Sequence, residues 1–348
     1  MPEDINYSPY VIVGKLSRDF ILTDKGNDLN GVPGGHLLYS AIGMSPWEKH
    51  PGLVSRISKN YPELYIKLLE KHGLDVRSIK IVDDQIEDRC FINYFTKEHN
   101  SEKKDNIQKS VLTQYFNAGK PFPRELLGFN NRRIKTDSMT ERTSETILAR
   151  DIPKEYLEAR CVHLCPMDYL SHNLLPQVFS KNRRATVSIQ AGEGYMQPYF
   201  FEAIKSLLNG VSAFIVREKN LRKLFSENFR VSKLYEMMKI LLDYGTDNII
   251  VKANDSFFYF INNNDRIIRK LNYSQNSVYE KIGELSCFCG AFLVGLNQTY
   301  DYKKAVCYGV SRASLLSNEV NPYSNFDVYE GLVNEKAYAL EKYIESQQ

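Results

Sequence analysis

The chain has 348 residues, of which 43% are hydrophobic and 25% are charged, an ordinary balance for a globular protein. The formal net charge of +3 is too small to indicate a nucleic-acid-binding protein, because lysine and arginine are interspersed with acids. No stretch of about 18 apolar residues predicts a membrane span. The acidic start lacks an apolar signal core, which predicts a cytoplasmic location.

The first elements are strands and a glycine-led helix. Residues 10–22 predict two short strands, and residues 30–44 predict a turn followed by a helix of small residues. Gly34 and Gly35 precede that helix and allow a ligand or a strand to approach the backbone closely. A strand at 52–57, an amphipathic helix at 61–73 and strands at 78–84 and 88–96 follow. Leu64 and two further leucines form the apolar stripe of that helix.

Residues 97–150 differ in character from the rest of the chain. Their stretches 97–109 and 132–146 are polar and are not expected to bury much core. A long polar insertion of this kind is a surface excursion, a lid or a partner surface. The sequence leaves these alternatives open.

From residue 151 onwards, strands and helices alternate. Strands are predicted at 160–166, 185–191, 212–217 and 248–253, helices at 171–181, 198–208, 218–227 and 232–244, a hairpin at 256–271, and final helices from near Ser286, at 301–317 and at 331–346. Such alternation implies parallel strands joined by right-handed crossovers, with helices on both faces. Ligands of such sheets bind beyond the carboxyl ends of the strands.

The cysteines do not predict a disulfide framework or a metal centre. All six lack the spacing of a disulfide scaffold, and most lie in apolar stretches, where a thiol behaves as a small hydrophobe. Cys161, His163 and Cys165 alternate and therefore share one face of a strand. Their side chains would be splayed about 7 Å apart, which favours a core strand over a zinc site. We predict no metal site.

The front of the chain resembles the ribokinase-like (phosphofructokinase B type) family of sugar and nucleoside kinases. Residues 14–21, GKLSRDFI, resemble the family's opening strand and turn, with Asp19 at the position that usually holds substrate hydroxyls. Residues 34–44 resemble its Gly-Gly motif, in which Gly34 and Gly35 would close over the substrate.

Two later stretches extend the resemblance along nearly the whole chain. Residues 187–198 are similar to the family's strand and turn beside the phosphate site, and residues 311–326 resemble its late helix near the adenine pocket. The resemblance implies an α/β fold with three layers, α/β/α, a mainly parallel central sheet and a small β lid. It implies a single domain over 8–348, with lid strands around 15–35 and 79–96, the polar insertion at about 97–150, and a homodimer formed through the lid.

The stretch 278–296 is similar to the family's catalytic motif, D-(T/P)-T-G-A-G-D-x-F-x-x-G-F, but departs from it where the chemistry occurs. Setting the apolar helix residues in register aligns the loop as follows: Glu280 with the first Asp, Gly283 with the first Gly, Glu284 with the Ala, Leu285 with the second Gly, and Ser286 with the catalytic Asp. A shifted alignment would put Gly290 on that Asp. In either alignment no carboxylate occupies the catalytic position.

These departures weaken the reaction that the resemblance implies. The Ser286 hydroxyl is not ionised near neutral pH, and loss of a general base costs roughly 10²–10⁴ in rate. Leu285 resists the positive φ or close approach that glycine allows. Glu284 would itself occupy the anion site at the helix start. It would repel a phosphate about 5 Å away by roughly 3 kcal/mol. The alternative for Ser286 is helix capping.

The magnesium and nucleotide motifs are also changed. The family's N-x-x-E aligns with Arg217-Glu218-Lys219-Asn220, so Glu218 stands out of order, and its G-x-x-G aligns with 252–256, which has no glycine. Lys252 is either a remaining anion ligand at this former nucleotide site or a surface lysine. We therefore predict that binding of ATP and Mg²⁺ is weak or absent, and the sequence names no other cofactor.

The residues leave three functions open. The first is a pseudokinase that keeps a sugar- or nucleoside-type pocket, has lost ATP-dependent phosphoryl transfer, and acts by binding a ligand or a protein partner. The second is a repurposed enzyme that acts on a nucleoside, a sugar or its phosphate without ATP, with Asp19, Glu280, Glu284 or Ser286 recruited. The third is a divergent carbohydrate or nucleoside kinase.

Overall fold

The computed structural model describes residues 8–23, 28–94, 110–129, 136–180, 185–227, 231–253, 257–272, 282–317 and 321–346. The strands of the larger sheet are β1 (Tyr10–Val13), β4 (Gly52–Ser58), β5 (Asp75–Val82), β7 (Cys161–Leu164), β8 (Thr186–Gln190), β9 (Ala213–Arg217), β10 (Asn248–Lys252), β11 (Phe257–Asn262) and β12 (Arg269–Asn272). Their order is β12-β11-β10-β9-β8-β7-β1-β4-β5.

In this spatial order, each strand from β10 across the sheet to β5 is parallel to its neighbours. Strand β11 is antiparallel to both β10 and β12. Every residue of β1 and β10 is buried, as expected for parallel strands that are covered on both faces. The antiparallel pair β11–β12 confirms the hairpin predicted at 256–271 within the residues described.

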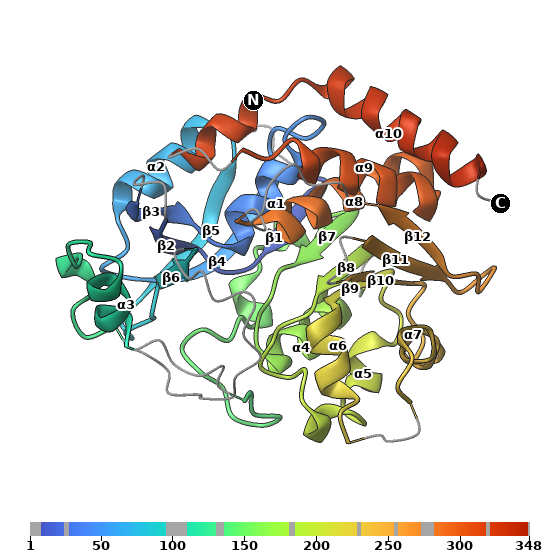
Figure 1. The fold of residues 1–348 in the computed structure, drawn as a ribbon, viewed down its shortest axis with the longest axis horizontal. Helices are drawn as coiled ribbons and strands as arrows, with labels where there is room; N and C mark the ends of the chain where they lie inside the picture. The colour runs from blue at the N-terminus through green and yellow to red at the C-terminus, as the bar shows by residue number, and fades with distance from the viewer. Residues whose placement is uncertain are drawn as a thin grey trace.

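Helices cover both faces of this sheet (Figure 1). On one face lie α1 (His36–Met44), α2 (Glu63–Lys71), α8 (Glu284–Thr299), α9 (Tyr302–Ser314) and α10 (Glu330–Ser346). On the other face lie α4 (Tyr169–Ser180), α5 (Ile204–Leu208), α6 (Glu218–Leu224) and α7 (Leu234–Asp243). The predicted three-layer α/β/α architecture is confirmed. The helices on each face pack against the sheet, and separate clusters of buried apolar side chains lie on the two faces.

Helices α1 and α8 touch through their backbones. A Cβ atom on Gly43 would overlap the carbonyl oxygen of Cys287, and one on Gly290 would overlap the carbonyl oxygen of Ser40. Only glycine allows this approach at both positions. The contact fixes α1, which begins with His36, against the first turns of α8, which carry Ser286.

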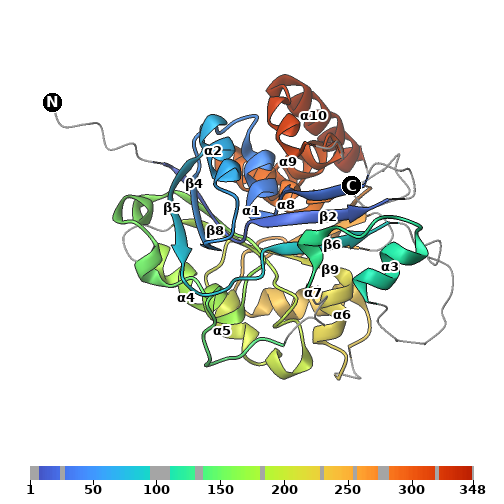
Figure 2. The ribbon, with the colours of Figure 1, turned by 90° about the vertical axis from the view of Figure 1, so that its left-hand side faces the viewer.

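A three-stranded sheet lies beside this unit, and we call it the lid after the prediction (Figure 2). Its strands are β2 (Ser17–Leu22), β3 (Leu29–Gly34) and β6 (Arg89–Asn93), in the order β3-β2-β6. Of the range 79–96 that we assigned to the lid, residues up to Val82 lie in β5 of the larger sheet.

The insertion buries more apolar surface than its polarity suggests. Within it, α3 (Val111–Asn117) packs Val111 and Tyr115 against Phe20 of the lid, and Ile147 joins the main core. The polar stretch 97–109 lies outside the described residues.

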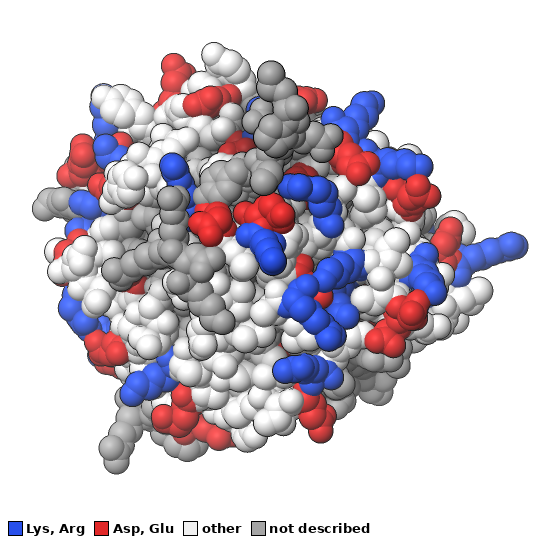
Figure 3. Space-filling model, turned by 180° about the vertical axis from the view of Figure 1, so that it is seen from behind, with Lys and Arg blue, Asp and Glu red and all other residues white. Residues whose placement is uncertain are grey.

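One local expectation is wrong. Leu64 is 62% exposed, so the apolar stripe of α2 is narrower than predicted, and only Leu69 is buried in that helix. Helix α8 begins at Glu284, two residues before Ser286, near which its start was predicted. Among the helices of the described residues, none is both long and apolar enough to cross a membrane. Acidic and basic side chains intermingle over the face seen in Figure 3.

Candidate functional site

The candidate site lies where three neighbouring parallel strands end. Gln190, Arg217 and Lys252 are the last residues of β8, β9 and β10, and Arg217 is paired in register with Lys252. Helix α8 begins opposite these strand ends. This is the edge of a parallel sheet at which ligands bind.

An ion pair lies between the end of β10 and the start of α8. The ammonium group of Lys252 donates a hydrogen bond to Glu284 Oε2. The side chain of Lys252 is 9% exposed and that of Glu284 is not exposed at all. The interpretation of Lys252 as a surface lysine is therefore wrong. A buried carboxylate at a helix start also interacts favourably with the helix dipole.

Gly283 makes this arrangement of α8 sterically feasible. It occupies the N-cap position with a φ of 70°, and a Cβ atom there would overlap the ring of Tyr39. A residue with a side chain would meet both the strained backbone and the ring.

Ser286 is held between two polar side chains from different elements. Its Oγ donates to Gln190 Oε1 over 2.9 Å and lies 2.8 Å from His36 Nδ1. The serine is 1% exposed. The capping interpretation is wrong, because Gly283 holds the N-cap position and Ser286 lies inside the helix.

Asp19 lies in the middle of the lid, on β2, between Val32 of β3 and Cys90 of β6. It is 3% exposed and accepts a hydrogen bond from Ser17 Oγ at 2.5 Å. Burial raises the pKa of this carboxyl to about 6, and the hydrogen bond from Ser17 opposes the rise. Its carboxyl lies directly against Gly34, where a Cβ atom would overlap it.

Gly35 connects the lid to α1. It has a φ of 102°, and a Cβ atom there would overlap the carbonyl oxygen of Lys15. The Gly-Gly pair therefore provides the close approach expected from the sequence, with Asp19 on one side and the turn after β1 on the other.

Charged groups of both signs surround His36, which begins α1 and is exposed there. Its pKa is lowered to about 4, first because the surrounding protein disfavours the charged ring and then because cationic Arg217 and Lys15 act on it. Glu193 opposes this effect. Lys15 is itself paired with Glu145 of the insertion.

Solved structures with this arrangement of elements are known. Ribokinase from Thermotoga maritima superposes with a TM-score of 0.60 at 17% identity, covering 97% of this chain and 99% of that chain. The nucleoside kinase from Methanocaldococcus jannaschii has a TM-score of 0.61 at 12% identity, covering 96% and 99%. This chain has the ribokinase fold.

A third ribokinase-fold structure was solved with its ligands. Aminoimidazole riboside kinase from Salmonella enterica, complexed with aminoimidazole riboside and an ATP analogue, has a TM-score of 0.62 at 11% identity and covers 94% of this chain and 99% of that chain. No family model and no curated protein matches the sequence. The likeness is therefore one of fold.

The ribokinase fold brings together most, but not all, of the predicted site residues. Glu284, Ser286 and Lys252 meet at the start of α8. Glu218 begins α6, where it pairs with Arg222 and lines a separate cavity of about 510 Å³. Glu280 and residues 254–256 lie outside the described residues.

Sequence reasoning missed His36 and Gln190. His36 directly follows the Gly-Gly pair, which was a usable signal because that motif should face the ligand. Gln190 had a weaker signal, as the last residue of a predicted strand. Neither signal could reveal which residue its side chain contacts, because the partners are far apart in sequence: 250 residues separate His36 from Ser286.

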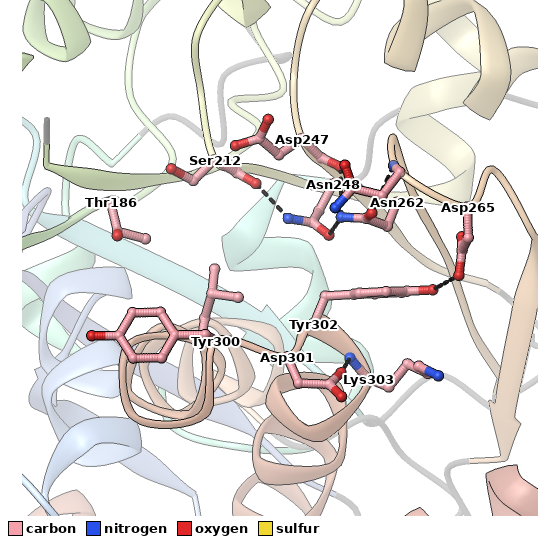
Figure 4. Close-up of a pocket in the computed structure, with 12 residues that line it drawn as sticks. Thr186, Ser212, Asp247, Asn248, Asn262, Asp265, Tyr300, Asp301, Tyr302 and Lys303 are labelled. Atoms are coloured by element: carbon pink, nitrogen blue, oxygen red, sulfur yellow. Dashed lines mark hydrogen bonds between the residues drawn. The ribbon is translucent and has the colours of Figure 1, made fainter.

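A polar cavity of about 530 Å³ lies at the opposite edge of the sheet (Figure 4). Its side chains bond to one another: Asn262 Nδ2 donates to Asn248 Oδ1, and Asn248 Nδ2 donates to the carbonyl oxygen of Ser212. The Tyr302 hydroxyl donates to Asp265. Because it lies at the amino ends of β9 and β10, this cavity is distinct from the site at Ser286.

The strand that carries Cys161, His163 and Cys165 is part of the core. All three are buried, and His163 Nδ1 lies 2.9 Å from Ser188 Oγ. Across the described residues, no group of three or more His, Cys, Asp or Glu side chains is placed to hold a metal ion.

Proposed function

We propose that this ribokinase-fold chain is a pseudokinase: it binds a sugar- or nucleoside-like ligand beneath its lid and does not transfer phosphoryl groups from ATP. The observation that carries the proposal is the start of α8. There, Glu284 is paired with Lys252, and Ser286 stands at the position that the resemblance gives to the catalytic aspartate.

Two physical arguments support the loss of transfer. A serine whose proton is already bonded to Gln190 is a poor base, and removal of a general base costs roughly 10²–10⁴ in rate. Glu284 also places a negative charge where a transferring phosphoryl group needs donors. Lys252 offsets that charge, so the pair offers a phosphate little net attraction.

The lid supports the binding half of the proposal. Asp19 is a buried acceptor close to Gly34, and a buried carboxyl of this kind is suited to ligand hydroxyls. A protein partner that reads the liganded state would make such a protein a sensor. The homodimer through the lid also remains our proposal, and sedimentation that gives only monomers at high concentration would contradict it.

Calorimetry tests the nucleotide half. We expect no binding of ATP or ADP in the presence of Mg²⁺, and no phosphorylation of any sugar or nucleoside offered with ATP. Magnesium-dependent nucleotide binding followed by transfer would overturn the proposal. The variant Ser286→Asp is the informative comparison, because it returns the carboxylate without changing Glu284.

A thermal-shift panel of sugars and nucleosides tests the ligand half. A ligand that stabilises the wild type should stabilise Asp19→Asn less, by mass action. The matched control is Asp84→Asn, an exposed aspartate between β5 and β6. Equal shifts in all three proteins would remove Asp19 from the binding site.

A second candidate function is a repurposed enzyme that works without ATP. The distance of 2.8 Å between His36 and Ser286 favours it, because it places two groups that can take part in proton transfer side by side at the carboxyl ends of the parallel strands. Mass spectrometry of a bound ligand after incubation without ATP distinguishes the two. An unchanged ligand supports the binding protein, and a converted ligand supports the enzyme.

A further inference from the structure

The hydrogen bonds around Ser286 determine which nitrogen of His36 carries the proton. A serine hydroxyl has one proton to donate. Ser286 donates it to Gln190 Oε1 over 2.9 Å. The contact of 2.8 Å between Ser286 Oγ and His36 Nδ1 is then a hydrogen bond only if His36 is the donor.

We infer that Gln190 and Ser286 hold His36 as its Nδ1-protonated tautomer, so that Nε2 is left as an acceptor and a ligand that meets it presents a hydroxyl or N–H donor, not a phosphate. The assignment of the ligand rests on the proposed function. The assignment of the tautomer does not, because it follows from the protein alone.

The surroundings of His36 keep the ring neutral. The groups that act on it come from several elements: Arg217 ends β9, Lys15 follows β1 and Glu193 follows β8. The pKa of His36 is lowered, first by the desolvation that the surrounding protein imposes on the charged ring and then by Arg217 and Lys15, so the ring is neutral near pH 7. His36 is exposed, and its contact with Ser286 uses Nδ1, which leaves Nε2 to a ligand.

An acceptor at this position selects ligands by whether they offer a hydrogen-bond donor. A free hydroxyl can donate to Nε2, whereas the oxygens of a phosphate at neutral pH are acceptors and would face a lone pair. Sites built to receive a donor reject analogues that lack it by large factors, so we expect phosphorylation at that hydroxyl to weaken binding at least about 100-fold.

Nitrogen NMR of the isotope-labelled protein tests the tautomer directly. In the wild type near pH 7, the spectrum should show His36 with a protonated Nδ1 and an unprotonated Nε2. Ser286→Ala should remove this preference and give a mixture. The matched control is Ser188→Ala, which removes a hydroxyl bonded to His163 and should leave the His36 signals unchanged. A protonated Nε2 in the wild type would overturn the inference, since it would mean that Ser286 donates to His36.

Calorimetry with matched pairs tests the ligand. The probes are ribose with ribose 5-phosphate and adenosine with adenosine 5′-monophosphate. We expect only free forms to bind, and His36→Gln to lower the discrimination between members of a pair. Phosphorylated forms that bind as tightly as the free ones would overturn the assignment of the ligand. If no member of either pair binds, the choice of ligand class in the proposed function is overturned, while the NMR result still decides the tautomer.

Discussion

Replacing Asp19 with asparagine should make the protein more stable at neutral pH than at acidic pH, relative to the wild type. The pKa of Asp19 is raised from 3.8 to about 6, mainly by burial. Below its unfolded-state pKa, both states hold the proton and the carboxyl costs nothing. Between about pH 4 and pH 6 the unfolded state releases its proton while the folded state keeps it, so stability is lost progressively, and above about 6 both states are ionised and the loss is complete.

The size of this effect follows from the pKa. A rise of that size corresponds to about 3 kcal/mol once both states are ionised. About 2 kcal/mol of it should develop between about pH 4.5 and pH 7.5. Asparagine cannot ionise, so the stability of Asp19→Asn relative to the wild type should rise by that amount over the range.

The assay is urea denaturation of both proteins at several pH values. Any change in the hydrogen bond from Ser17 shifts the variant by a constant amount, and the titrations of the histidines occur in both proteins, so neither alters the pH-dependent difference. The control Asp84→Asn is exposed and should show no pH-dependent difference. Parallel curves for the wild type and Asp19→Asn would refute the reasoning, because they would mean that Asp19 is solvated in the folded protein.

Three further variants probe the packing of the site. Gly34→Ala places a methyl group against the Asp19 carboxyl. It should lower the free energy of unfolding in urea by about 1–3 kcal/mol and weaken ligand binding. Unchanged stability would mean that the lid moves freely. Gly283→Ala should cost more than Gly128→Ala, because both have positive φ but only Gly283 faces a ring, and equal losses would contradict the contact with Tyr39. Glu284→Gln removes the charge opposite buried Lys252 and should lower the free energy of unfolding by about 3–5 kcal/mol. The double variant that also carries Lys252→Met should recover most of this loss. Additive losses would show that the two side chains are independent.

The fold was predictable because its signals are local and repeated. Apolar runs such as 248–253, separated by helices with turn residues, indicate parallel strands without knowledge of any contact. The start of α8 was misjudged by two residues, since Ser286 is a good N-cap by type and the left-handed conformation of Gly283 is visible only in three dimensions.

The site was only partly predictable for a different reason. The alignment identified Glu284 and Ser286 as replacements, but their partners come from distant strands and from α1. From the sequence, Lys252 could be an anion ligand or a surface lysine. The ion pair that decides between these interpretations depends on where β10 ends relative to α8. Long-range pairing of this kind has no periodic signal in a single sequence.

The glycine contact between α1 and α8 has a consequence for protein engineering. The two helices meet through backbone atoms at Gly43 and Gly290, so the side chains of Glu284 and Ser286 take no part in this contact. Both side chains can therefore be exchanged without redesign of the contact between the helices. Glu284→Ala and Ser286→Asp together would return two positions of the kinase motif to a scaffold whose helix spacing is unaltered. Such a variant would measure how much of phosphoryl transfer depends on the first turn of α8 and how much on the rest of the chain.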